Sequence, residues 1–264
     1  MPYHNQVATI NVGNTHTSAV VWHDSRLAVM NFAWQTSRNP PGTFLKFMEK
    51  FGSPVILAGV VPARKKMIQR MLNQFDIIPF IFRGRRLPAK IEILPRPPSK
   101  VGDDRIAAAL GALAFDATSA WVVVDAGTAV TVNAVTPGAG ELLPRFEGGL
   151  IFAGAGISLG ALSKSTAQLP LLSANFFSEP SFIGRDTEKA MSLGAYHAQT
   201  AAAIGLCKGI LRELDGDANI ALTGGGADMA FVKEFRREFS NTQFIYDPQL
   251  VHRGLMHAWK TQCL

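Results

Sequence analysis

The stretch "TINVGNTHTS", residues 9–18, decides the fold. It reads as the end of a buried strand followed by a tight polar turn, in which Gly13 lets the backbone approach a ligand and Asn14 adds a side-chain donor. Successive backbone N–H groups in such a turn form a concave site for an anion. The strand ends near Asn11, where an enzyme that transfers phosphate is expected to keep a carboxylate for its metal. The stretch therefore predicts a phosphate site with a neutral residue at its mouth.

The same pattern recurs in "VDAGTAVTVNAV", which begins at Val124. One offset superposes four positions: Asn11 on Asp125, Gly13 on Gly127, Asn14 on Thr128 and Thr17 on Thr131. Each stretch is a strand, a glycine turn and a second strand, and such repetition favours two similar domains, at residues 1–118 and 119–264. The alternative is a pair of unrelated hairpins, because Asn-Gly and Gly-Thr pairs are frequent in turns.

The length and composition fit one large core or two modest ones, with 264 residues, 47% hydrophobic and 17% charged. No run approaches the roughly 18 apolar residues of a membrane span, and the N-terminus lacks a basic segment followed by an apolar one. We therefore expect a cytoplasmic protein without a membrane partner. Cys207 and Cys263 fit no disulfide or zinc pattern, so they are expected to be buried or idle thiols.

Short β-branched runs alternate with longer amphipathic runs, which predicts an α/β protein. The predicted strands are 6–12, 17–22, 26–34, 54–60, 77–82, 120–126, 129–136, 141–151, 218–223 and 242–246. The predicted helices are 42–51, 63–74, 104–117, 156–168, 186–213, 227–239 and 248–260. The proline-rich stretch 83–100 can be neither a regular helix nor a central strand, and its length suggests a functional surface loop.

The net charge of +6 is concentrated between Arg64 and Lys100, where ten basic residues face only Asp76 and Glu92. An anionic ligand, nucleic acid or a solvated basic surface would each account for this excess. The stretch carries no recognisable nucleic-acid-binding motif, so nucleic acid is not expected as a partner.

A second candidate site is "VGDDRIAAALGALAF", residues 101–115, which enters an alanine-rich helix. Capping the helix explains one of Asp103 and Asp104, but not both. Arg105 offers a fork for a carboxylate or phosphate, and Asp104 can accept a proton from a substrate hydroxyl. An acid binder beside a base is what phosphorylation of a hydroxy acid requires.

Two glycine-rich passages, residues 146–162 and 221–228, each lead into a predicted helix, where backbone groups can bind a nucleotide. The sequence contains no motif typical of other classes of reaction. The sequence has neither a GxxxxGK[ST] phosphate loop nor a GxSxG elbow, and its histidines, such as His252 and His257, have no metal-ligand spacing.

With these residues in view, the sequence resembles the type III pantothenate kinases of the sugar kinase, Hsp70 and actin superfamily. Five motifs appear in order, namely "NVGNT", "GDDR", "DAGTAVTVN", "GGLIFAG" and "TGGGAD", with a fainter match at "GRDTEKAMSLG". The resemblance implies two actin-like (RNase H-like) domains, each a mixed sheet flanked by helices, with the nucleotide in the cleft between them. It further implies ATP-dependent phosphorylation of pantothenate to 4'-phosphopantothenate, the first step to coenzyme A, with Mg²⁺ on the nucleotide, a monovalent cation (K⁺ or NH₄⁺) and a homodimer.

Carried over position by position, the resemblance implies three groups of site residues. ATP would be bound by Asn11, Val12, Gly13, Asn14, Thr15, His16, Thr17, Ser18, Thr128, Gly224 and Gly225. Pantothenate would be bound by Gly102, Asp103, Asp104, Arg105 and Thr187, with Asp104 as general base and Arg105 on the carboxylate. Asp125 would be the ligand of the monovalent cation.

The sequence departs from the family pattern at several positions. Asn11 and Asn133 stand where aspartates are expected, Ala153 replaces a proline, and the stretch 94–96 lacks a tyrosine that faces the substrate. Three hypotheses follow: a divergent but active pantothenate kinase, a non-catalytic nucleotide-binding regulatory homologue, and a kinase of another small hydroxy acid.

Overall fold

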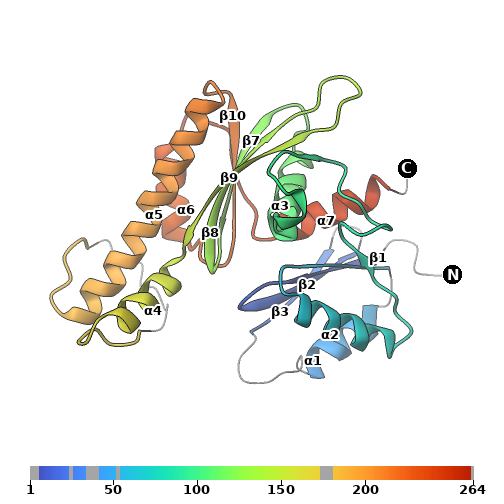
Figure 1. The fold of residues 1–264 in the computed structure, drawn as a ribbon, viewed down its shortest axis with the longest axis horizontal. Coiled ribbons are helices and arrows are strands. Elements are labelled where there is room, and N and C mark those ends of the chain that lie inside the picture. Colours follow the sequence, from blue (N-terminus) through green and yellow to red (C-terminus); the bar gives the residue numbers. More distant parts are fainter. Residues whose placement is uncertain (1–5, 24–25, 34–41, 52–53, 173–180, 263–264) are drawn as a thin grey trace. The chain divides into compact units, whose positions relative to one another are not determined.

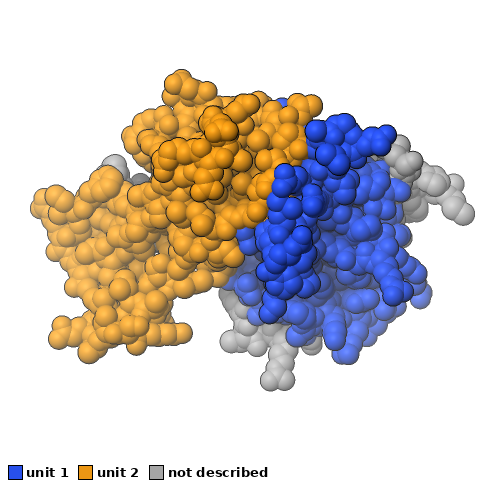
Figure 2. Space-filling model, turned by 45° about the horizontal axis from the view of Figure 1, so that its top comes forward, with its two compact units in different colours: residues 1–117, 138–145, 249–264 blue, residues 118–137, 146–248 orange. Residues whose placement is uncertain are grey.

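The computed structural model describes residues 6–23, 26–33, 42–51, 54–172 and 181–262. The chain forms two compact units, coloured separately in Figure 2. Unit 1 holds residues 1–117, 138–145 and 249–264, and unit 2 holds residues 118–137 and 146–248. The chain therefore enters unit 2 after residue 117, and its C-terminal segment belongs again to unit 1.

Unit 1 contains a five-stranded sheet in the order β3-β2-β1-β4-β5, with helices on both faces (Figure 1). Its elements are β1 (Gln6–Val12), β2 (His16–His23), β3 (Arg26–Ala33), α1 (Gly42–Phe51), β4 (Val55–Gly59), α2 (Pro62–Asn73), β5 (Phe80–Ile81), β6 (Glu92–Ile93), a 3₁₀ turn (Pro98–Lys100), α3 (Asp103–Leu113) and α7 (Leu250–Lys260). The strand pairs β1–β2 and β2–β3 are antiparallel, whereas β1–β4 and β4–β5 are parallel.

Unit 2 repeats this topology, with strands in the order β9-β8-β7-β10-β11. Its elements are β7 (Ala120–Ala126), β8 (Ala129–Thr136), β9 (Arg145–Ala153), α4 (Ala155–Ser165), α5 (Thr187–Glu213), β10 (Ala218–Thr223), α6 (Met229–Glu238) and β11 (Phe244–Tyr246). The pair β7–β8 is antiparallel, and β10 is parallel to both β7 and β11. The prediction of an α/β protein with two similar mixed sheets is confirmed.

The core of unit 1 follows from the alternation of side chains along β1. Ile10 and Val12 are buried against Phe44 of α1 and Ile68 of α2, so Thr9 and Asn11 point to the opposite face of the sheet. Helix α7 contacts β1 and β4 and packs closely along α3. The close packing needs Gly254, because a Cβ there would collide with the backbone of α3.

In unit 2 the strands β7 and β10 are packed against α5 and α6, with Val122 and Val124 buried beside Phe231 and Phe235. Cys207 lies in this core, and burial raises the pKa of its thiol to about 12. The expectation of a buried or idle thiol is met at Cys207 by its burial, while Cys263 lies outside the described residues.

Several element boundaries differ from expectation: the helices predicted at 104–117 and 156–168 end earlier, at Leu113 and Ser165, and two strands are shorter or shifted. The strand predicted at 77–82 is only Phe80–Ile81. The strand predicted at 141–151 begins at Arg145, because a turn precedes it in which the N–H of Leu142 donates to the carbonyl of Ala139 at 3.1 Å. Among the described helices, none combines the length and apolar character needed to cross a membrane.

Candidate functional site

The first glycine turn closes between β1 and β2. The N–H of Gly13 donates to the carbonyl oxygen of His16 at 2.9 Å, and a Cβ on Gly13 would lie 2.9 Å from that oxygen, so the turn requires glycine. Asn14, Thr15 and His16 are exposed. This is the geometry in which a turn can offer N–H groups to an anion.

The two residues on either side of this exposed turn are buried. Val12 and Thr17 pair across the strands and are each 0% exposed. Both belong among the predicted ATP-binding residues, and from these positions they can contribute through their backbone.

Arg64 of α2 brings a positive charge to this turn, although no local sequence pattern marks it. Its guanidinium donates to the carbonyl of Gly13 at 3.4 Å and also to the carbonyl of Asn14. Because Arg64 lies some 50 residues along the chain from Asn14, only the general excess of basic residues after position 64 pointed to it. Arg64 thus holds the two carbonyls and places a cationic group on the turn.

Asn11 faces away from the α1–α2 core and lies directly opposite Ser18 of β2. Its Oδ1 is buried and has no hydrogen-bond partner among the described residues. A buried acceptor left in this state costs about 1–3 kcal/mol. Asn11 is therefore a group that a ligand, a water or a cation would satisfy.

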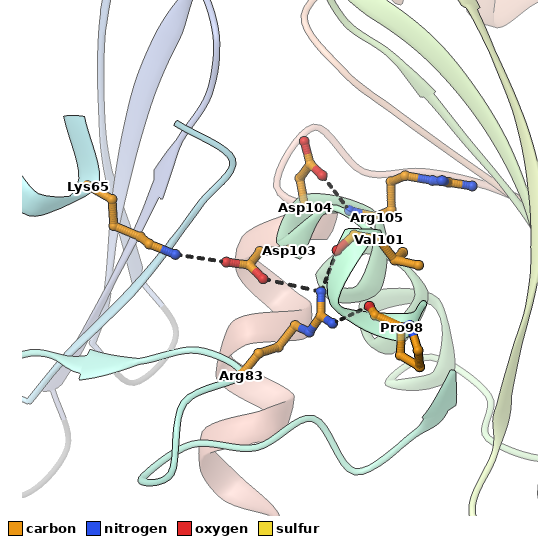
Figure 3. A network of polar contacts seen from close by, with 7 residues as sticks. All are labelled: Lys65, Arg83, Pro98, Val101, Asp103, Asp104 and Arg105. Carbon is orange, nitrogen blue, oxygen red and sulfur yellow. Dashed lines mark hydrogen bonds and ion pairs between the residues drawn. The ribbon is translucent and has the colours of Figure 1, made fainter. Parts of the chain in front are cut away.

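The two carboxylates at the start of α3 have different surroundings, as Figure 3 shows. Asp103 points to the cations Lys65, at 3.1 Å, and Arg83, at 3.4 Å. Arg83 also donates to the carbonyls of Val101 and Pro98 and so holds the end of the loop 83–100 against α3. Asp103 is committed to an ion-pair network, while Asp104 points away from both cations (Figure 3).

The carboxyl of Asp104 differs from that of a solvated aspartate in its pKa. Burial raises the pKa of its carboxyl above the ordinary value, the hydrogen bond from the N–H of Arg105, at 2.8 Å, lowers it in part, and the charge of Asp103 raises it further. A carboxylate with a raised pKa takes a proton more readily than a solvated one. Gly102 makes room for it, since a Cβ there would lie 2.5 Å from Asp104 Oδ1.

Arg105 follows directly in the same helical turn. Its side chain is partly buried, which lowers the pKa of the guanidinium, and the charge of Asp104 acts in the opposite direction. An arginine remains charged under such shifts, because its ordinary pKa exceeds about 12. Asp104 and Arg105 thus lie together at one helix terminus, and their roles as base and carboxylate-binding cation stay predictions.

Unit 2 gathers the predicted residues of the second hairpin. The end of β7, with Asp125, lies beside the end of β10. Gly224 has φ +101°, and a Cβ on it would lie 2.5 Å from Asp125 Oδ1, while the N–H of Gly226 donates to Ala126 at 2.7 Å. The turn after β10 is thereby held against the turn after β7.

The glycine-rich passage before α4 reaches the same place. The N–H of Gly154 donates to the carbonyl of Thr128 at 3.1 Å. Gly225, in the neighbouring turn, has open space where a side chain would stand. Asp125, Thr128, Gly154, Gly224 and Gly225 therefore form one cluster of strand ends and helix starts within unit 2.

Two further positions complete the set. Thr187 is exposed at the start of α5, where the carboxylate of Asp186 caps the helix by accepting from the N–H of Lys189 at 2.7 Å. Asn133 is 0% exposed and donates to the hydroxyl of Thr131 at 3.0 Å. A neutral amide suits this buried place, since a carboxylate there would need a compensating charge.

Comparison with known proteins gives a consistent result. The family model described as type III pantothenate kinase matches residues 8–209. The chain is 31% identical over 235 residues to a type III pantothenate kinase of Anaeromyxobacter dehalogenans strain 2CP-C, covering 83% of this chain and 87% of that one. It is 29% identical over 270 residues to a type III pantothenate kinase of Legionella pneumophila strain Corby, covering 96% and 97%.

Solved structures are similar in fold at low identity. The activator of the 2-hydroxyisocaproyl-CoA dehydratase from Clostridium difficile, solved with bound ADPNP, aligns with a TM-score of 0.52 at 16% identity, covering 98% of this chain and 97% of that one. An archaeal actin homologue, Ta0583, solved in complex with ADP, aligns with a TM-score of 0.52 at 14% identity, covering 96% and 97%. The fold of this chain is actin-like.

Proposed function

This chain belongs to the type III pantothenate kinase family, and from that premise we propose that it phosphorylates pantothenate with ATP, the first step of coenzyme A synthesis. The observation that carries the proposal is the start of α3, where the half-buried carboxylate of Asp104 has a raised pKa and stands beside Arg105. Pantothenate has a hydroxyl to be activated and a carboxylate to be bound, and these two groups match the two side chains.

The residues of unit 1 divide the reaction between them. Asp104 accepts the proton of the pantothenate hydroxyl. The hydroxyl oxygen attacks the γ-phosphorus of ATP, and the bond between that phosphorus and the bridging oxygen breaks, so that ADP leaves. Arg105 orients the substrate through its carboxylate. The turn at 13–16 binds phosphate oxygens, with Arg64 supplying positive charge beside it. Such positioning and charge neutralisation make up most of phosphoryl-transfer catalysis.

The residues present fit a Mg²⁺ ion carried by the nucleotide. The described residues include no group of three or more His, Cys, Asp or Glu side chains that could cage a metal. Mg²⁺ usually keeps several waters and binds through substrate phosphates with one or two protein oxygens. The unpartnered Oδ1 of Asn11 is such an oxygen, although a neutral one. When bound, the ion would neutralise the charge of the phosphates.

The remaining assignments belong to the same proposal. Asp125 is proposed as the ligand of a monovalent cation, Thr128, Gly224 and Gly225 as nucleotide contacts, and Thr187 as a substrate contact. They are supported by their motifs and, in unit 2, by the clustering of strand ends described above. We further propose that the protein acts as a homodimer in the cytoplasm.

The test is turnover of ATP by the purified chain with pantothenate, Mg²⁺ and K⁺, with the phosphorylated product identified by mass spectrometry. Replacing Asp104 by asparagine removes the base and is expected to lower kcat by about 10²–10⁴-fold. The matched control is Asp103→Asn, which changes the adjacent carboxylate in the same way. It is expected to affect stability and KM more than kcat, because Asp103 is held by Lys65 and Arg83.

A second candidate function is that of a regulatory homologue, which binds nucleotide without turnover. It follows from Asn11, because the neutral oxygen of this residue brings no charge to the metal. Folded protein that is stabilised by ATP but gives no product with pantothenate would favour it. Product formation with another hydroxy acid, in a panel that includes pantothenate, would instead favour a kinase of different specificity.

A further inference from the structure

A chain of buried hydrogen bonds reaches the phosphate hairpin from α7. His252 is 2% exposed, and its ring joins two hydroxyls of the sheet. Nδ1 lies 2.9 Å from Thr9 Oγ1, and Nε2 lies 2.7 Å from Ser18 Oγ. The indole N–H of Trp22 donates to the same Thr9 oxygen at 3.2 Å. Four side chains from β1, β2 and α7 are therefore linked in one row that ends at Ser18.

The donors in this row of hydrogen bonds show in which direction the bonds run. The indole of Trp22 can only donate, so Thr9 Oγ1 accepts from it and has a single proton of its own to give. That proton can go to Nδ1 of His252, at 2.9 Å, or to the carbonyl of Val20, at 3.3 Å. The shorter contact favours His252. Nδ1 is then the acceptor of the neutral ring, and Nε2 carries the proton that is donated to Ser18.

This direction decides what Ser18 can offer. Once its oxygen accepts from His252, its own proton is available to a ligand, whereas the opposite tautomer would take that proton. Asn11 Oδ1, directly across the hairpin, does not hold the proton either, because it has no hydrogen-bond partner. Phosphate oxygens are acceptors, so only a donating Ser18 can bind them. Bonds that run in one direction also strengthen one another.

We propose that His252 is a positioning residue that acts through Ser18, fixing its hydroxyl as a donor to a phosphate of the bound nucleotide. The inference rests on the proposed function for the identity of the ligand as ATP. It adds a residue from the C-terminal helix, 234 positions from Ser18 in the chain, to the determinants of nucleotide affinity.

The test is a double-mutant cycle on the full chain, with the Kd of ATP measured by calorimetry. Ser18→Ala removes the donor and is expected to raise the Kd about tenfold, the effect of losing a hydrogen bond to a charged group. His252→Leu is expected to have a similar effect. The double variant is expected to bind no more weakly than Ser18→Ala alone, since both changes remove the same bond. His252→Gln, which keeps an amide donor, is expected to restore part of the affinity.

The matched control is His257→Gln, on the same helix but without a hydrogen bond to the hairpin among the described contacts; it is expected to leave the Kd unchanged. A second readout needs no variant: the nitrogen-15 spectrum of labelled histidine should show His252 with its proton on Nε2. A purely structural role would give additive effects in the cycle, a lower Tm with unchanged Kd, or a proton on Nδ1. Any of these results overturns the inference. If His252→Leu does not fold, the position of the proton in the nitrogen-15 spectrum of the wild type decides between the two roles.

The outcomes separate this inference from the proposed function. Wild-type protein that binds ATP with the expected coupling, but makes no phosphopantothenate, would refute the function and keep the inference. Normal turnover with no coupling between Ser18 and His252 would support the proposed function and refute the inference. A wild type that does not bind ATP contradicts both.

Discussion

Hairpin 1 (β1–β2) and hairpin 2 (β7–β8) occupy equivalent positions in their sheets but differ in their turns. Three residues, 13–15, separate β1 from β2, whereas two, 127–128, separate β7 from β8. The extra residue shifts the pairing by one, so that Asn11 faces Ser18 while Asp125 faces Thr131. A shift of one residue moves side chains to the other face of a sheet. The duplicated site has therefore kept its strands and changed the side chains it presents.

The charges at the two hairpins differ in the same sense. Hairpin 1 has a neutral amide at Asn11 and the guanidinium of Arg64 on its turn. Hairpin 2 has the carboxylate of Asp125 at the matching strand end. An anion is favoured at the first and a cation at the second. Under the proposed function, the two copies of one hairpin would therefore bind ligands of opposite charge.

Among changes at the two hairpins, the largest expected effect comes from removing the charge of hairpin 2. Asp125→Asn should lower kcat by roughly 10²–10³-fold, the range for loss of a preorganised electrostatic group. It should also abolish the dependence of the rate on K⁺, measured by steady-state kinetics over a range of K⁺ concentrations. Asp217→Asn, a change at an exposed aspartate of the same unit, serves as control. A variant that keeps its response to K⁺ would break the assignment of a cation to hairpin 2.

The packing of hairpin 2 against the turn after β10 gives the next effect. Gly224→Ala places a methyl group 2.5 Å from Asp125 Oδ1 in a residue with φ +101°. The change is expected to lower the free energy of unfolding by about 1–3 kcal/mol, the usual range for overpacking, as measured by urea denaturation. Gly225→Ala is the matched control, because nothing lies within 4 Å of its added methyl. Equal effects of the two changes would contradict this packing.

Converting hairpin 1 toward hairpin 2 is expected to have a smaller effect. Asn11→Asp adds a carboxylate near the bound metal, and about 1 kcal/mol of added attraction would lower the Mg²⁺ concentration for half-maximal rate about fivefold. A Mg²⁺ titration of the rate measures it, with Asn73→Asp as control for the change in net charge. If the Mg²⁺ concentration for half-maximal rate does not change, Asn11 is not near the metal. The difference between the two hairpins would then have no role in metal binding.

The pH profile gives the smallest effect and concerns neither hairpin. Burial raises the pKa of Asp104, and the base must be ionised, so kcat/KM should fall as pH decreases through a pKa above that of a free aspartate. The same shift means that the folded state favours the protonated form, and this stabilisation is lost as pH rises through the folded-state pKa. Asp104→Asn should therefore raise Tm at neutral pH, measured by calorimetry. An unchanged or lower Tm would contradict the buried, charged state.

The sequence predicted the topology because hydrophobic periodicity and turn chemistry act locally. The repeat of a strand, a glycine turn and a strand was enough to anticipate two mixed sheets, and the structure confirms both. The pairing register of the strands could not be predicted from the sequence. Aligning Thr17 with Thr131 extends the repeat past the turns, but the two turns differ in length, and Thr17 is buried opposite Val12.

The candidate site was predicted where its residues are consecutive and missed where they are distant. Gly102 to Arg105 form one helical turn, so their types alone suggested a base beside a cation. Arg64 and His252 reach hairpin 1 from α2 and α7, and no local pattern marks them. His252 lacked any metal-ligand spacing, and its partners are hydroxyls that only the folded sheet brings to it.

The return of the C-terminal helix to unit 1 has a consequence for biosynthesis. Leu250, Val251 and Leu255 of α7 are buried, and α7 lies against α3 and against β1, the strand that leads to the turn at residues 13–15. On a ribosome, the first sheet emerges before unit 2, yet α7, which covers it, is made after unit 2. Chains tend to fold from the N-terminus during synthesis, but here the first sheet has to wait, with one face uncovered, until α7 has been made.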